Sequence, residues 1–262
     1  MNFKQYVIVL AVLAAAFVLV GVANATHSWN GYHWARTSNP FTLKLGDNVS
    51  SVWDPYLDEA IADWSLSSVL DLTEVVGNTK PRICKPKTGQ IEVCSESYGK
   101  TGWIGIAQVW ISGSHITQAI TKVNDTYFKT VKYNKPAWRR LVMCQEIGHD
   151  FGLAHQNEIF EDTNLGTCMD YTNDPDGTLA NPDQLSNEHP NAHDYAQLET
   201  IYAHLESAFT AFQPTDGGSK GKPASVGQDI DLNDPSAWGK AVKQDARGNK
   251  SLYERNLGNG EK

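Results

Sequence analysis

The sequence predicts an α+β fold, in which a twisted mixed sheet is covered by a few helices. Three observations support this prediction. Short segments rich in aromatic and β-branched residues, which are typical of strands, are spread over the first half of the chain. Two longer segments have apolar residues at helical spacing. The 262 residues are enough to bury a core between such layers, in one or at most two domains.

The first 25 residues have the features of a signal peptide. Lys4 precedes an apolar run that begins at Tyr6, and the run ends at Ala23-Asn24-Ala25, a small-x-small sequence that signal peptidase accepts. The run is close to about 17 residues, the lower limit for a membrane-spanning helix, so an uncleaved anchor is the alternative. The cleavage sequence favours export. We therefore expect a secreted protein, periplasmic in a Gram-negative host, without stable membrane insertion after cleavage.

Two strands and a helix should follow the leader. Residues 32–36 (YHWAR) and 41–45 (FTLKL) have the composition of strands. Asp54-Pro55 resembles an N-cap followed by proline at the first helical position, so a helix should begin there. Its apolar face would consist of Tyr56, Leu57, Ala60, Ile61 and Trp64. This spacing predicts a helix that packs on the sheet.

The middle of the chain should supply three more strands. Residues 69–76 (VLDLTEVV) have strand composition and lead to a loop over residues 84–94. Residues 102–111 (GWIGIAQVWI) are mostly apolar, which favours an inner strand, although a buried helix has the same pattern. Residues 115–123 (HITQAITKV) interleave branched and polar residues, which suits a strand nearer the edge. Its backbone could receive an extended peptide, but an ordinary half-exposed strand fits equally well.

Two helices should complete the domain. One begins at Pro136 and ends at Gly152, and the other follows residues 191–194 (NAHD). The apolar stripe of the last helix would contain Tyr195, Leu198, Ile201, Tyr202, Leu205, Phe209 and Phe212. The composition then shifts to Pro, Gly, Ser, Lys and Asp. We therefore expect one domain over residues 26–212 and a hydrophilic, flexible tail over residues 213–262.

Charge and cysteine content narrow the classes of partner and compartment. The 22 basic and 30 acidic residues give a net charge of −8, which argues against a nucleic acid or an anionic membrane as partner. The composition does not specify an oligomeric state. Four cysteines in an exported chain indicate two disulfides, and three pairings are open. We favour Cys84 with Cys94 and Cys144 with Cys168.

The segment CQEIGHDFGLAH has the spacing of a metal site. Gln145 and His149 lie one helical turn apart on the same face. Gly152 can adopt the left-handed conformation that ends a helix, and the resulting turn would bring His155 to the same point. A catalytic zinc ion has three protein ligands and one position for water. Glu146, beside that face, would accept the proton of the water.

This segment resembles the signature of the metzincin zinc peptidases, H-E-x-x-H-x-x-G-x-x-H followed by a methionine turn. Glu146, His149, Gly152 and His155 match the signature in identity and spacing, and Met169 matches the methionine. The detailed match covers residues 145–171, and in outline the likeness extends over residues 32–212. The long signature together with the methionine is a specific pattern.

The resemblance implies a fold, a reaction and residue roles. The fold would be a zincin-like catalytic domain with a backing helix, an active-site helix, a methionine turn and a C-terminal helix. The activity would be zinc-dependent hydrolysis of protein or peptide substrates. Met169 would lie beneath the metal, and Tyr171 would reach the metal or stabilise the oxyanion.

Gln145 departs from the signature, which has histidine at this position. An amide oxygen is a weaker zinc ligand than an imidazole, so zinc should bind less tightly. Glu146 favours a working site, because an unpaired carboxylate on a partly buried helix is costly. His193 is an alternative ligand. The other reading is a catalytically silent binding protein on a peptidase fold.

Calcium has no support, because the Asp-rich loop NDPDG fits no EF-hand spacing.

Overall fold

The computed structural model describes residues 27–180, 182–210, 234–258 and 260–262. The expected signal peptide over residues 1–25 lies outside these described residues. Within the described part of the chain, each helix is too short or too polar to cross a membrane.

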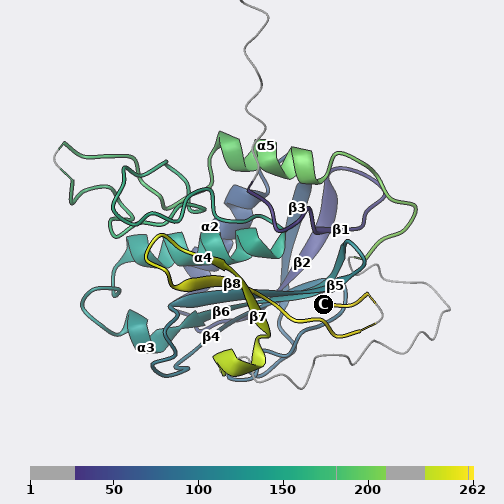
Figure 1. Ribbon diagram of the computed structural model, residues 1–262, viewed down its shortest axis with the longest axis horizontal. Coiled ribbons are helices and arrows are strands. Elements are labelled where there is room, and N and C mark those ends of the chain that lie inside the picture. Colours follow the sequence, from purple (N-terminus) through teal and green to yellow (C-terminus); the bar gives the residue numbers. More distant parts are fainter. Residues whose placement is uncertain (1–26, 181, 211–233, 259) are drawn as a thin grey trace, which may run out of the picture.

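A six-stranded sheet forms the centre of the fold (Figure 1). Five strands run parallel in the order β1-β6-β4-β2-β3, and β5 is antiparallel to β6. The strands are β1 His33–Trp34, β2 Phe41–Asn48, β3 Leu70–Val76, β4 Gln90–Glu96, β5 Gly105–Ser112 and β6 His115–Asn124. The protein therefore has a mixed, mostly parallel sheet with few helices, which agrees with the α+β prediction at this level.

The edge of the sheet differs from the sequence prediction. We expect residues 115–123 at the edge and 102–111 inside, but β6 pairs with β1, β4 and β5, and β5 is the edge strand. The alternation in β6 misleads because its polar side chains are also buried and paired: Thr121 Oγ1, for example, donates to Asp150 Oδ2 at 2.8 Å. The apolar run of β5 is only half-buried over most of its length, because it lines a cleft.

A further strand was not predicted. β4 occupies much of the segment assigned to a loop over residues 84–94. Its polar side chains, such as Gln90 and Glu92, are buried and hydrogen-bonded to each other, so its composition does not indicate a central strand. Both predicted disulfides are present: Cys84–Cys94 connects the preceding loop to β4, and Cys144–Cys168 connects a helix to the segment that contains Met169.

The described residues form four α-helices: α2 Asp54–Trp64, α3 Asp125–Phe128, α4 Pro136–Asp150 and α5 Ala192–Ile201. α2 packs on α4 and β3, and α4 packs on β5 and β6. The N-cap of α2 is Trp53, so the predicted boundary is off by one residue. In Figure 1, α4 lies between the sheet and α5. The core between these layers contains the fully buried side chains of Trp34, Trp53 and Trp64.

α5 is shorter than the predicted last helix. It ends at Ile201, and the side chains of Leu205 and Phe209 are exposed instead of extending the apolar stripe, while Phe212 lies outside the described residues. The chain leaves the helix because it runs beside the residues after β1. The backbone N–H of Glu206 donates to the carbonyl oxygen of Arg36 at 2.8 Å.

The last described residues do not form a flexible tail, which corrects the prediction for this part of residues 213–262. They contain a 3-10 turn, η1 Pro235–Ala237, and two antiparallel strands, β7 Lys240–Gln244 and β8 Lys250–Glu254. Most side chains of β7 are exposed, and most of those of β8 are half-buried. This hairpin is ordered against the face of the domain that carries α4 and β5 (Figure 1). Residues 211–233 lie outside the described residues.

Candidate active site

The candidate site lies at the end of α4 and in the turn that follows it. Gly152 has a φ of 93°, in the left-handed region that favours glycine. A Cβ atom on Gly152 would lie 2.0 Å from the carbonyl oxygen of Tyr32, so a larger residue does not fit. The turn therefore brings His155 back toward the helix face that carries His149.

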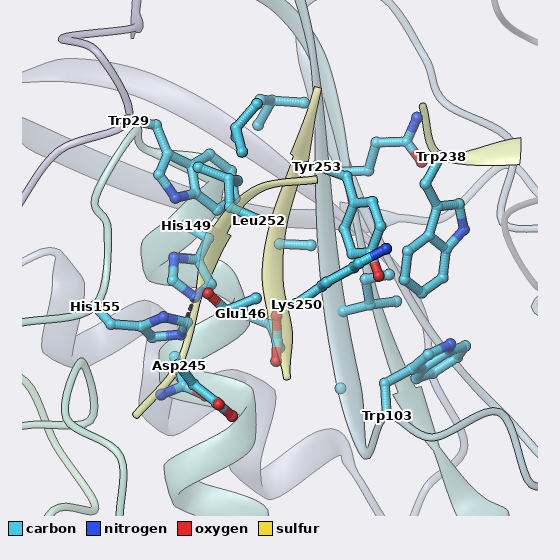
Figure 2. Close-up of a pocket in the computed structure, with 18 of the residues that line it drawn as sticks. Trp29, Trp103, Glu146, His149, His155, Trp238, Asp245, Lys250, Leu252 and Tyr253 are labelled. Carbon is cyan, nitrogen blue, oxygen red and sulfur yellow. Dashed lines mark hydrogen bonds between the residues drawn. The ribbon is translucent and has the colours of Figure 1, made fainter. Parts of the chain in front are cut away.

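His149 and His155 point at each other. Their Nε2 atoms are 2.9 Å apart, and their rings are nearly perpendicular at 84° (Figure 2). The Nδ1 atom of His149 donates to the carbonyl oxygen of Leu153 at 2.8 Å, and that of His155 donates to Glu158 Oε1 at 2.8 Å. Trp29 stacks on His149. Both rings are therefore fixed with their Nε2 atoms directed at one point.

The hydrogen bonds of this pair indicate what fits between the rings. An Nδ1 atom that donates carries the proton, so each neutral imidazole presents a lone pair at Nε2. Burial lowers the pKa of both histidines, and that of His149 well below its usual value, so both are neutral near pH 7. Two lone pairs at 2.9 Å repel, and a shared cation removes that repulsion. Imidazoles whose Nδ1 atoms are held by a carbonyl and a carboxylate are typical zinc ligands.

Gln145 is anchored at one end of its amide. Its Nε2 atom donates to the carbonyl oxygen of Cys168 at 2.9 Å, a contact next to the Cys144–Cys168 disulfide. Its Oε1 atom accepts no hydrogen bond from the described residues and is the atom that could ligate a cation. The structure thus brings two imidazoles together at one point. The amide oxygen of Gln145, on the same helix face as His149, remains available as a third metal ligand.

Glu146 is a buried carboxyl group beside these histidines (Figure 2). Burial raises its pKa to about 8, although a hydrogen bond from the backbone N–H of Ala107 partly opposes the rise. A Cβ atom on Gly105 would lie 2.7 Å from the Glu146 side chain, so glycine at this point of β5 makes room for the carboxyl. Glu146 is therefore suited to exchange a proton near neutral pH.

Met169 lies under α4, and Tyr171 lies beside His155. Met169 is fully buried. Its sulfur would be 2.7 Å from a Cβ atom on Gly148, the residue before His149, so Met169 packs under this part of α4. The ring of Tyr171 lies 4.3 Å from that of His155. Burial raises the pKa of the Tyr171 phenol, so its hydroxyl keeps its proton and can donate a hydrogen bond.

Other polar residues differ from the sequence-based reading. Glu158, which holds His155, was not predicted as part of the site, and its spacing of three residues after His155 is the signal that could have found it. Asp150, the last residue of α4, is fully buried, and burial raises its pKa well above the usual value. His193 does not join the cleft histidines. Its Nδ1 atom lies 3.0 Å from Nε2 of His27.

The site opens into a cleft of about 600 Å³ between α4 and the edge strand β5. Gln145, Glu146, His149, His155 and Tyr171 line one side of the cleft. Residues of the β7–β8 hairpin line the other side (Figure 2). The arrangement can hold a cation, transfer a proton and present a strand edge.

Comparison with known proteins gives little independent guidance. No family model matches the chain, and no curated protein sequence matches it. Among solved structures, the chain is similar to high choriolytic enzyme 1, a hatching enzyme zinc-protease from Oryzias latipes (medaka fish), with 11% identity and a TM-score of 0.34. The match covers 65% of this chain and 94% of that one. A likeness at this level does not establish a shared family or activity.

Proposed function

We propose that this protein is a zinc-dependent endopeptidase of the metzincin type. The observation that supports the proposal most strongly is the pair of buried imidazoles with converging Nε2 atoms and fixed Nδ1 atoms. His149, His155 and the Oε1 atom of Gln145 would hold the zinc ion. When bound, zinc acts as a Lewis acid and lowers the pKa of water to about 7.

The residues of the chain would perform the proton transfers and position the substrate. Glu146 accepts a proton from the attacking water and passes it to the leaving amine. Tyr171 donates a hydrogen bond to the oxyanion. An extended peptide would lie along β5, because this strand, and not the strand of residues 115–123, is the edge strand beside Glu146. The leader sequence and two disulfides support action outside the cytosol.

A catalytically silent binding protein is the second candidate. Two observations favour it: the amide nitrogen of Gln145 is committed to Cys168, and the β7–β8 hairpin covers the cleft. In this case the cleft would hold a partner without cleaving it.

Zinc content and the Glu146→Gln variant separate the two candidates. The purified protein should retain zinc, and it should cleave an unfolded protein substrate until a chelator is added. Glu146→Gln should retain zinc but lose activity by about 10²–10⁴-fold, because only the proton acceptor is removed. Glu199→Gln, on the exposed surface of α5, is the matched control. Absence of zinc from the cleft, or equal activity of Glu146→Gln and the wild type, would eliminate the peptidase proposal.

A further inference from the structure

A second group of histidines lies outside the cleft, on β1, on β6 and in the segment after α5. Three imidazoles surround one carboxylate oxygen, Oε1 of Glu206. Nε2 of His33 and Nε2 of His115 are each 3.3 Å from it, and Nε2 of His204 is 2.7 Å from it. The ligand atoms of His33, His115 and Glu206 all lie within 4.8 Å of one another. We call these four residues the second histidine cluster.

The geometry of the second histidine cluster is that of a ligand set. His33 is buried, and its Nδ1 atom donates to the carbonyl oxygen of Gly31 at 2.7 Å, so its Nε2 atom presents a lone pair to Glu206. A neutral imidazole in this orientation repels the carboxylate. Protonating all the histidines would place positive rings 4.9 to 5.0 Å apart. One divalent cation satisfies the lone pairs and the carboxylate together.

We propose that the second histidine cluster is a structural metal site that binds a divalent transition metal, with zinc as the preferred ion. His33, His115 and Glu206 are its ligands, and the more exposed His204 supplies the fourth. Imidazole and carboxylate ligands suit zinc, and the carbonyl of Gly31 fixes the orientation of His33. The ion would fasten the segment after α5 to β1 and β6, a connection otherwise made by few hydrogen bonds.

Zinc binding by a protein without the cleft ligands tests this site. In a His149→Ala/His155→Ala protein, equilibrium dialysis against zinc alone should yield one bound equivalent per chain. Adding Glu206→Gln or His115→Asn should weaken that binding at least tenfold, because each change removes one ligand. His189→Asn is the control, since His189 is exposed and pairs with Asp63 elsewhere.

Thermal unfolding supplies a second readout. Zinc should raise the melting temperature of the His149→Ala/His155→Ala protein but not that of the same protein with Glu206→Gln. No zinc binding by the protein without cleft ligands, or unchanged binding after Glu206→Gln, would show that the cluster is an ion pair only. These outcomes do not depend on peptidase activity, so they are separate from failure of the proposed function.

A second inference comes from an independent observation, the position of the β7–β8 hairpin. Leu252 lies near Trp29 and His149 in Figure 2, and Lys250 lines the same cleft as Glu146. The hairpin therefore occupies the part of the cleft in which a substrate would meet the proposed ligands and proton acceptor.

The hairpin is attached to a residue that supports the cleft histidines. Lys243 Nζ lies 2.8 Å from Glu158 Oε1, and Ser251 Oγ donates to Glu158 Oε2 at 3.1 Å. The backbone N–H of Ala246 donates to the carbonyl oxygen of Glu158 at 3.2 Å. Glu158 in turn holds His155. A nearby ion pair joins Arg247 to Glu161.

The residues after the hairpin occupy the edge of β5. Ile111 and Lys262 exchange two backbone hydrogen bonds of 2.9 and 3.0 Å, and the N–H of Gly113 donates to the carbonyl oxygen of Gly260 at 3.1 Å. The pairing around Ser112 is antiparallel. These are backbone groups that an added strand would use. The chain's own residues and an extended substrate therefore cannot both pair with this part of β5.

We infer that the β7–β8 hairpin is an inhibitory segment that keeps the cleft closed, an inference that rests on the proposed peptidase function. Part of its attachment suits release: most side chains of β7 are exposed, and the Arg247–Glu161 pair is an exposed ion pair, a kind that contributes only about 0–1 kcal/mol. Displacing or cutting the hairpin would expose the edge of β5 and the side of the cleft that carries His149, His155 and Glu146.

The variant Arg247→Glu/Leu252→Lys tests this inference in the full chain. Arg247→Glu places a second carboxylate beside Glu161, and Leu252→Lys places a positive charge in the cleft near His149. The hairpin should therefore detach. Hydrolysis of an unfolded protein should rise at least fivefold, and the amides of Ile111 and Gly113 should exchange with solvent faster. Leu66→Lys, a matching change at an exposed leucine, should alter neither.

The two readouts distinguish the possible failures. Faster amide exchange without any activity would contradict the proposed peptidase function while confirming release. Unchanged exchange, or released protein with lower activity than the wild type, would show that the hairpin is a fixed part of the cleft and would overturn the inference.

Discussion

The cleft histidines and the second histidine cluster present similar chemistry but arise in different ways. His149 and His155 are six residues apart and are brought together by one helix end and one glycine turn. The members of the second cluster come from β1, β6 and the segment after α5, and His33 and Glu206 are 173 residues apart. A local site survives as long as one turn is intact. A site of distant ligands requires the whole sheet to be assembled.

The largest expected effect would come from removing a ligand from the local site. His155→Ala should lower peptidase activity by about a thousandfold, equivalent to about 4 kcal/mol, and should remove the cleft zinc. The second cluster should keep its ion because it shares no residue with the cleft. Elemental analysis before and after the substitution would check this result, and loss of both ions would show that the two sites are not independent.

The turn itself provides the next comparison. Gly152→Ala should destabilise the protein by about 3 kcal/mol, because the new Cβ atom meets a backbone oxygen at 2.0 Å in addition to the left-handed strain. Gly99→Ala is the matched control, since its φ of 90° is similar but no atom lies within 4 Å of the new Cβ. It should cost about 1–2 kcal/mol. Chemical denaturation would measure both values, and equal losses would contradict the steric argument.

Acid should lower the free energy of unfolding because His27, which supports the turn before His155, takes up a proton. Its Nδ1 atom donates to the carbonyl of Ala154 in the turn before His155, and burial lowers its pKa to about 4. A depressed folded-state pKa contributes stability above the unfolded-state value of about 6.5, and this stability is lost as the pH falls toward 4. The loss should reach about 2–3 kcal/mol.

Unfolding free energies between pH 7 and pH 4 would measure this effect. His27→Asn, which can keep the donation to Ala154 without titrating, should show a shallower dependence on pH over the same interval. Parallel curves for the wild type and this variant would mean that other groups cause the acid sensitivity.

The smallest expected effect concerns the departure from the metzincin signature. Gln145→His should tighten zinc binding in the cleft by about tenfold, or about 1.4 kcal/mol, because imidazole is a better zinc ligand than an amide oxygen. Turnover should change little if the site is already occupied. Competition with a chromogenic chelator would give the affinity, and weaker retention than in the wild type would show that position 145 does not face the ion.

Much of the local structure was predictable because it depends on neighbours in the sequence. The proline at the start of α4, the spacing of four between Gln145 and His149, and Gly152 specify a helix and a turn almost independently of the rest. The cysteine pairs agree with the favoured pairing for a similar reason, since each closes a loop within one part of the chain.

The tertiary structure decided the features that depend on burial on two sides of a strand. Periodicity cannot show that Gln118 and Thr121 have partners inside the protein, so β6 was assigned to the edge and β5 to the interior. The same limit hid β4, whose buried Glu92 and Gln90 satisfy each other. The helix after Asn191 ended early because backbone groups beyond β1 offered partners to Glu206.

By itself, the sequence determined a helix, a glycine turn and the side chains that they direct toward one point, because these depend on backbone geometry within a few residues. Only the tertiary structure decided which strand forms the edge, where Glu206 meets three imidazoles and what covers the cleft. Those contacts join segments far apart in the chain, and the free energy of such contacts comes from burial and pairing that have no local pattern.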